Sequence, residues 1–411
     1  QFTLEIYGNA NEDDTIDMRD VTYIKLVIFG KKPETDLCDA NYDGRVSMLD
    51  VVQTKLIIVG KEGEITIVDS ANRTVTVSKP VKRIVSLNLG ASEVLRSLKA
   101  KDRIVGVDCY TKEEEVFFPE LSKLPSVGGP GGGHPEPDYE KILELDPDIV
   151  ITYGVGWGAT PIEDVLEPAG ITVVRLDLYK PMTMVEEIEK LGYILDKRNE
   201  AKEFIDFYEE CLNSIKEKTE DLPEEDKKKV YYEINWDYYT INKDSGMHQL
   251  IEMAGGINIG ADLLAEFVEV DPEWVITQNP DIIIRDEYIA ANGYDVDDPT
   301  EMKEAREAIL SRTKLAGVTA IKDKSVYVVS CTMIESPRHF IALGYLAKWF
   351  HPDLFEDLDP EAIHQEYLTR FQGLDYDLDE HGVFVYPPII KGKGKLAGIP
   401  DRYYDTIVGQ Q

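Results

Sequence analysis

Two stretches near the start of the chain carry oxygen-bearing side chains at matching intervals. Segments 9–30 and 39–60, NANEDDTIDMRDVTYIKLVIFG and DANYDGRVSMLDVVQTKLIIVG, align at a 30-residue offset. Calcium takes about six to eight oxygen ligands, drawn from positions 1, 3, 5, 7, 9 and 12 of a loop. The repeat therefore predicts two Ca²⁺ sites. Their ligands would be Asn9, Asn11, Asp13, Thr15, Asp17 and Asp20 in the first loop, and Asp39, Asn41, Asp43, Arg45, Ser47 and Asp50 in the second.

Each predicted loop leads into a helix with an apolar face, and position 8 of each loop is apolar, which would pair the loops. Residues 5–62 thus resemble a dockerin module, the calcium-dependent partner of a cohesin. The resemblance implies an extracellular protein. Asp14 stands where that family usually has Gly, and the positions that choose the partner hold Met18, Arg19, Met48 and Leu49. A cohesin-like partner, a calcium-stapled spacer and docking to the same chain or to a copy of it all stay open.

Composition narrows the classes of partner. The 411 residues include 44 Lys plus Arg against 78 Asp plus Glu, a net charge of −34 that repels phosphate backbones. We expect no nucleic-acid partner. No apolar run is long enough to span a bilayer. The chain opens on Gln1, so we expect an exported protein whose leader has been removed, or a trimmed chain.

Four scattered cysteines match no CxxC metal spacing, so two disulfides and free buried thiols are both open. They are Cys38, Cys109, Cys211 and Cys331. Asn72 begins the sequon Asn72, Arg73, Thr74, a glycosylation candidate in an exported chain.

A long amphipathic segment from Met184 to Thr219 divides the rest of the chain. Apolar residues recur in it at helical spacing, and short apolar strands alternate with helical runs on either side. This pattern predicts an α/β fold of two lobes joined by one helix, or else one α/β domain with a long helix. The predicted parts are a calcium module at 1–64, a lobe at 65–182, the linking helix at 183–220, a lobe at 221–372 and an extension at 373–411.

Residues 65–372 resemble the solute-binding proteins of ABC importers for metal chelates, the class of the cobalamin, haem and ferric siderophore binders. The matching motifs include RIVSL, GASEVL, YEKILELDPDIVI, EMAGGINIG, PEWVITQNPDIII and the SPR at 336–338. The resemblance implies capture of a chelate, delivery to an ABC permease, and a glutamate on each lobe that meets the permease, at Glu140 and Glu273. Either glutamate alone also reads as a carboxylate favoured by a helix N-terminus.

The ligand is expected at loops that follow the carboxyl ends of the strands. Aromatic residues with a few arginines suit a flat or bulky chelate that carries acidic groups, although each aromatic residue alone is more often core. A further alternative is that His134 and His339 face each other across the cleft and ligate a chelated metal. The full set of candidates is Asn88, His134, Tyr153, Trp157, Trp236, Tyr238, Tyr239, Arg285, Tyr288, Arg338 and His339.

Two further hypotheses concern the role of the C-terminal extension and the possibility of an enzyme. The apolar patch VFVYPPII in the extension would cover the protein's own surface or add to a neighbour's sheet edge. Together with the calcium module, it supports an alternative function, an extracellular assembly or filament subunit built on a solute-binding fold. An enzyme is the weakest reading, because the sequence has no GxSxG or HExxH motif.

Overall fold

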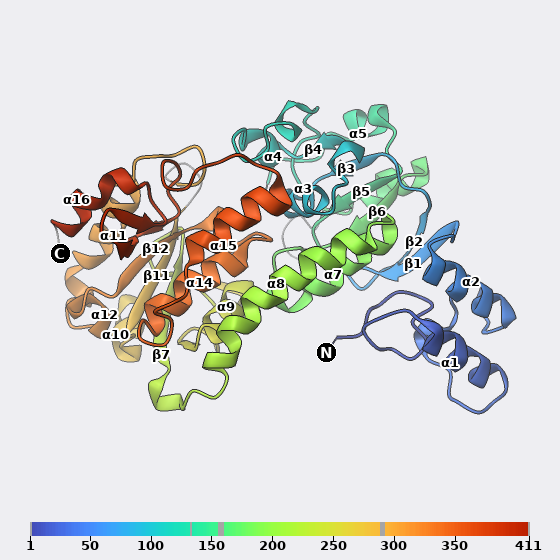
Figure 1. The fold of residues 1–411 in the computed structure, drawn as a ribbon, viewed down its shortest axis with the longest axis horizontal. Coiled ribbons are helices and arrows are strands. Elements are labelled where there is room, and N and C mark those ends of the chain that lie inside the picture. Colours follow the sequence, from blue (N-terminus) through green and yellow to red (C-terminus); the bar gives the residue numbers. More distant parts are fainter. Residues whose placement is uncertain (1, 132–133, 155–159, 288–291, 410–411) are drawn as a thin grey trace. The chain divides into compact units, whose positions relative to one another are not determined.

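The computed structural model describes residues 2–131, 134–154, 160–287 and 292–409. The chain forms two compact units, residues 1–178 with 183–205 and residues 179–182 with 206–411. The first unit takes in both the predicted calcium module and the predicted N-terminal lobe. Helix α8 (Arg198–Thr219) begins in the first unit and ends in the second (Figure 1).

The segment predicted as one linking helix contains two helices. α7 (Pro181–Ile194) ends at a turn in which the Lys197 amide donates to the Gly192 carbonyl, and α8 follows. The residues expected on the buried face of the long helix are all buried, which confirms the helical period: Ala201, Phe204, Ile205, Tyr208, Leu212 and Ile215.

The N-terminal residues fold around α1 (Met18–Ile28) and α2 (Met48–Val59), drawn in blue in Figure 1. Asp17 and Ser47 cap these helices, each with an aspartate three residues later that completes a capping box. Ala10, Val21, Ile24, Cys38 and Val51 form their common core. All four cysteines of the chain are free thiols.

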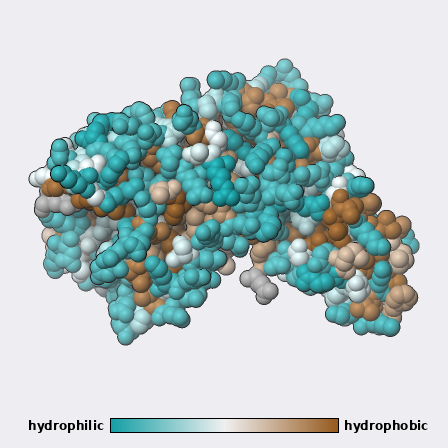
Figure 2. Space-filling view, in the orientation of Figure 1, coloured by the Kyte–Doolittle hydropathy of each residue, from teal (hydrophilic) through white to brown (hydrophobic). Residues whose placement is uncertain are grey.

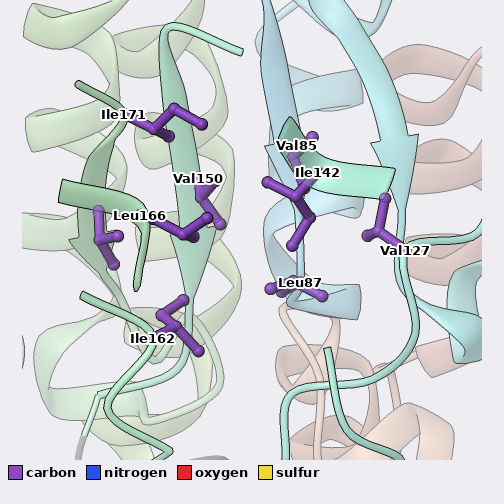
Figure 3. Close-up of a cluster of buried hydrophobic side chains, with 9 residues drawn as sticks. Val85, Leu87, Val127, Ile142, Val150, Ile162, Leu166 and Ile171 are labelled. Carbon is purple, nitrogen blue, oxygen red and sulfur yellow. The ribbon is translucent and has the colours of Figure 1, made fainter. Parts of the chain in front are cut away.

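The first unit also holds a four-stranded parallel sheet in the order β4-β3-β5-β6. The strands are β3 (Ile84–Ser86), β4 (Ile104–Val107), β5 (Ile149–Thr152) and β6 (Thr172–Arg175). They alternate with α3 (Leu89–Ser97), α4 (Cys109–Glu113), α5 (Tyr139–Leu145) and α6 (Glu163–Leu166). Figure 3 shows the apolar side chains packed between sheet and helices, among them Val85, Val150 and Leu166. These strands are β-branched and apolar because a parallel sheet is covered on both faces.

A hairpin of β1 (Glu64–Val68) and β2 (Thr74–Ser78) precedes this sheet. Asn72 lies exposed in its turn with a φ of 56°, a backbone region that asparagine tolerates.

The second unit is built on a five-stranded sheet in the order β13-β12-β11-β7-β9. Four strands are parallel: β7 (Lys228–Ile234), β9 (Gly256–Asn258), β11 (Ile282–Glu287) and β12 (Val326–Ser330). The helices are α9 (Gly246–Met253), α10 (Pro272–Gln278), α11 (Thr300–Leu310), α12 (Thr319–Lys322), α13 (Cys331–Ile334), α14 (His339–Phe350) and α15 (Pro360–Tyr367). β8 (Tyr239–Ile241) pairs with β10 (Phe267–Glu269) at the side.

The C-terminal extension covers the protein's own sheet edge. β13 (Val385–Tyr386) pairs antiparallel with β12, and the hairpin of β14 (Ile389–Gly392) and β15 (Lys395–Ala397) leads to α16 (Tyr404–Val408). Val383, Leu396 and Ile399 are buried against Met302 and Val328. Of the two open readings of VFVYPPII, the structure shows the first. Among the described helices, none combines the length and apolarity that a membrane crossing requires.

This packing predicts that the extension stabilises the second unit. Leu396→Ala should lower the free energy of unfolding by about 2–4 kcal/mol, because Leu396 is fully buried and its loss leaves a cavity. Ile390→Ala, in the same hairpin but 38% exposed, is the control and should cost about 1 kcal/mol or less. Urea unfolding measures both. Equal effects of the two substitutions would show that the extension does not belong to the folded core.

Candidate ligand-binding site

Asn88, after β3, holds the carboxyl edge of the first sheet together. Its Oδ1 accepts from the Ala91 amide at 3.1 Å, and its Nδ2 donates to the Leu176 carbonyl at 2.7 Å. The residue is fully buried. Asn88 therefore caps α3 and ties it to the end of β6, which corrects its prediction as a ligand contact. Asparagine is a favoured N-cap residue, and in this role the polar side-chain atoms of Asn88 are already hydrogen-bonded to the backbone.

His134 forms a pair with Tyr110 at the same edge. The Tyr110 hydroxyl lies 2.7 Å from His134 Nδ1, and the two rings meet edge to face. Burial lowers the pKa of His134, which keeps the imidazole neutral near pH 7. Tyr110 was not predicted as a site residue, although its position just after strand β4 is one where ligand contacts are expected. A neutral imidazole beside a phenol can hydrogen-bond to a chelate or ligate a metal.

Tyr153 and Asp108 lie near this pair. Asp108 caps α4 and is buried, and desolvation raises its pKa to about 6 although the Thr111 hydroxyl donates to it at 2.7 Å. Tyr153 follows β5. Burial raises the pKa of its phenol, and the Asp108 carboxylate raises it further. Tyr153 is therefore a neutral hydrogen-bonding phenol. Trp157 lies outside the described residues.

In the second unit, Arg285 belongs to a buried charge network. Glu233 on β7 is fully buried and accepts from Arg285 at 2.8 Å and from both terminal nitrogens of Arg312 at 2.8 and 2.9 Å. The Arg312 guanidinium lies 4.9 Å from the centre of the Tyr238 ring. Arg285 and Tyr238 are thus committed to Glu233 and Arg312, which corrects the expectation that they face the ligand. Neither Glu233 nor Arg312 was predicted, because they are far apart in sequence and carry no motif.

Arg338 and His339 lie in the core of the second unit. The Arg338 Nε donates to the Thr332 carbonyl at 3.1 Å. His339 Nε2 lies 2.6 Å from the Tyr208 hydroxyl, and its Nδ1 lies 2.8 Å from the Ser336 carbonyl. Both side chains are buried, since they begin the largely buried helix α14. The expectations that Arg338 contacts the ligand and that His339 ligates a metal are therefore wrong. Tyr288 lies outside the described residues.

Two buried carboxyl groups also meet near the end of β11. Asp286 accepts from the Tyr232 hydroxyl at 2.8 Å and from the Asn235 amide at 2.7 Å, and desolvation raises its pKa to about 7. Desolvation also raises the pKa of Glu335, and the Asp286 charge adds to this shift. The pair can hold a proton close to the ligand edge. Sequence reasoning missed it.

Trp236 and Tyr239 remain open to a ligand in the second unit. Trp236 follows β7 and is 66% exposed, with its ring centre 5.7 Å from that of Tyr239 in an edge-to-face arrangement. An exposed tryptophan offers an apolar face that gains free energy when a flat ligand covers it.

Glu140 and Glu273 occupy equivalent places in the two units. Each is exposed in the first turn of a short helix, α5 for Glu140 and α10 for Glu273. Each helix is followed by a buried inner strand of its sheet, β5 or β11. The partial positive charge of the helix N-terminus favours a carboxylate there.

The predicted calcium loops place buried oxygen atoms at their ligand positions. Asp20 and Asp50 are fully buried, and desolvation raises the pKa of both. Each accepts one backbone amide per carboxylate oxygen, from Asn11 and Asp17 in the first loop and from Asn41 and Ser47 in the second. Each oxygen thus keeps a lone pair for a cation.

One amide oxygen in each loop is buried without a hydrogen-bond partner, Asn9 Oδ1 and Asn41 Oδ1. Such atoms are costly unless a donor or a cation satisfies them, so the loops fit a hard cation. Asp17 is less suitable, since Arg19 binds its carboxylate. Within the described ranges, no group of three His, Cys, Asp or Glu side chains is arranged to hold a metal. Asparagine and backbone oxygens would have to complete each set.

Comparison with known proteins shows the family to which the chain belongs. A family profile described as Periplasmic binding protein matches residues 84–330, more than half of the chain. The chain belongs to this family. An uncharacterised ABC transporter substrate-binding lipoprotein of Bacillus subtilis is 27% identical over 71% of this chain and 87% of its own. A cobalamin-binding protein of Halobacterium salinarum is 24% identical over 70% of this chain and 74% of its own.

Solved structures show the same fold. A TroA-like periplasmic binding protein from Veillonella parvula matches with a TM-score of 0.63 and 23% identity, over 78% of this chain and 98% of its own. The predictions of a two-lobed α/β fold and of the solute-binding class are confirmed.

The environment of His339 predicts a specific pH dependence. Burial lowers the pKa of His339 to about 4, against about 6.5 in an unfolded chain. Between these values the unfolded state binds more protons, so the stability that His339 contributes is present above about pH 6.5 and is lost as the pH falls toward 4. Urea unfolding of the wild type and His339→Gln should therefore give free energies that converge as the pH falls from 7 to 4.5. An imidazole of His339 that titrates near pH 6.5 in NMR spectra would contradict the buried placement.

Proposed function

We propose that the protein captures a metal chelate outside the cell, of the ferric siderophore, haem or corrinoid type, and delivers it to an ABC permease. Its membership of the periplasmic binding protein family supports the binding role, and relatives that bear the names cobalamin-binding and vitamin B12-binding protein support the ligand class. The observation that carries the proposal is the exposed Trp236, which packs edge to face on the half-buried Tyr239 just after β7. A role in binding and release requires no catalytic residue.

In each unit the proposal assigns the ligand to side chains that follow the carboxyl ends of the strands. Trp236 and Tyr239 would cover the apolar face of the chelate. In the first unit, Tyr110, His134 and Tyr153 would meet its polar groups or its metal, because all three are neutral donors or acceptors near pH 7.

Glu140 and Glu273 are the proposed contacts with the permease. Both are exposed, and neither forms an ion pair with another described residue. An uncommitted carboxylate on each unit suits basic pockets on the permease. Export also makes the exposed Asn72 available for glycosylation.

The ligand assignment is tested by isothermal titration against haem, cobalamin and a panel of ferric siderophores. We expect at least one chelate to bind, and Trp236→Ala to raise its Kd about tenfold or more, because exposed tryptophans that become covered often dominate binding. The control is the double variant Glu140→Arg with Glu273→Arg, which should keep the wild-type Kd but no longer co-purify with the permease. Failure of every chelate to bind would refute the assignment.

For the N-terminal module, we propose two bound Ca²⁺ ions. The buried, unpartnered amide oxygens of Asn9 and Asn41 and the buried carboxylates Asp20 and Asp50 support this assignment. In each loop a cation would neutralise the carboxylates and satisfy the amide oxygen at once.

A second candidate function, assembly through this module, is favoured by its exposed apolar side chains. Met18, Met48, Leu49, Val52 and Val59 are each more than half exposed. Figure 2 shows brown atoms gathered where Figure 1 places α1 and α2. Such a patch suits either a cohesin-like partner or a second copy of the chain. Sedimentation velocity of the calcium-loaded protein distinguishes these: a mass that rises with concentration supports assembly, and a constant monomer mass supports a different partner.

The calcium assignment predicts about two Ca²⁺ per chain when chelator-stripped protein is titrated calorimetrically. Asp20→Asn and Asp50→Asn should each abolish one site, because each removes a buried charge from a ligand position. Asp14→Asn is the control, since Asp14 is exposed and stands outside the ligand positions. No binding at millimolar calcium would refute the sites.

A further inference from the structure

The segment that leads into the first calcium loop is hydrogen-bonded to helix α7. Ile6 forms an isolated antiparallel bridge with Ile67 of β1, where the Tyr7 amide donates to the Thr66 carbonyl and the Val68 amide to the Glu5 carbonyl, each at 2.9 Å. The Glu5 amide donates to Glu186 on α7 at 3.3 Å. Lys190, one turn further along α7, is buried and binds Glu186 at 2.6 Å.

The helix that follows the second loop is fastened to the start of α8. Arg198 donates to the last carbonyls of α2, those of Ile57 at 2.9 Å and Ile58 at 3.2 Å. The guanidinium lies 5.0 Å from the centre of the Tyr193 ring. Tyr193, near the end of α7, is itself buried, and the backbone of Ile16 in the first loop interacts with its phenol. The first loop, through Ile16, and the helix that follows the second loop thus contact the α7–α8 segment.

Helix α7 in turn holds a loop at the ligand edge of the first sheet. The buried Glu187 accepts from the backbone amides of Asp177 at 3.1 Å and Leu178 at 2.6 Å, just after β6. The Asp177 carboxylate accepts from the Gly154 amide at 2.9 Å. Gly154 directly follows Tyr153, so these hydrogen bonds connect α7 to a proposed ligand residue.

We propose that calcium in the two loops braces the α7–α8 segment and, through Glu187 and Asp177, holds the backbone of Gly154 and thereby positions Tyr153 at the end of β5. The proposal rests on the calcium sites proposed above. Without a cation, the carboxylates of each loop repel one another and the loop loses its fixed shape. The segment at 4–8 and the end of α2 then lose the fixed positions that hold Glu5 against Glu186 and Ile57 against Arg198. Calcium thereby regulates the first unit's share of the ligand site.

Hydrogen exchange of the full-length protein with and without calcium tests the brace. In the wild type, amides in residues 183–205 and 172–178 should exchange about tenfold more slowly with calcium, the usual scale of coupling between two sites. Arg198→Ala should bind calcium but lose much of this protection, because it cuts the contact between α2 and α8. Arg198→Lys keeps the charge and should give an intermediate effect, which guards against misfolding of the alanine variant. Lys197→Ala, which removes only the neighbouring ion pair with Glu200, should behave as the wild type.

The outcomes separate the brace from the calcium sites. If titration shows bound calcium and the exchange of residues 183–205 does not change, the brace is refuted while the calcium sites stand. If calcium does not bind, both are refuted. If Lys197→Ala loses the protection as fully as Arg198→Ala, the effect is general stability of the helix start, and the brace is refuted.

Discussion

A charge removed from water must be neutralised by its neighbours, and this constraint decides which polar residues of the chain can serve a ligand. Glu233 lies on β7, an inner strand of the second sheet, with no exposed surface, and it binds both Arg285 and Arg312. Removing either arginine would leave a buried carboxylate partly unpaired. The arginines are therefore committed to the fold, and the proposed recognition rests instead on the exposed Trp236 and on neutral phenols and an imidazole in the first unit.

The sequence predicted the elements of the fold well, because local patterns carry them. The β-branched runs RIVSL and PDIII became buried parallel strands, and the apolar period of residues 201–215 became the buried face of α8. The family motifs then ordered these elements into two units. Pairings between residues that are far apart in the sequence could not be predicted. Glu233 and Arg312 are 79 positions apart, and nothing local marks them as partners.

The candidate site was predicted less well for the same reason. A polar residue after a strand can face a ligand or cap the next helix, and Asn88 caps. The position of the residue in the sequence does not distinguish a ligand contact from a helix cap, because the role depends on which backbone groups lie within hydrogen-bonding distance. His339 was misplaced because its hydrogen-bond partner, the Tyr208 hydroxyl, lies 131 positions away in the sequence, and no local pattern marks the two residues as partners. The patch VFVYPPII left two readings open, since a strand of that composition fits its own sheet edge as well as another chain's.

The two proposed roles of the N-terminal module, bracing α7 and α8 and docking to a partner, involve different residues of the module. Contacts with α7 and α8 involve the segment at 4–8 and the carbonyls near the end of α2. The exposed apolar residues Met18, Met48 and Leu49 instead lie at the first turns of α1 and α2, beside the last calcium position of each loop. The same ions would then shape a surface for an external partner and hold the segment at 4–8 and the end of α2, which contact α7 and α8. A brace inside the chain and a docking face outside it therefore do not compete for the same residues.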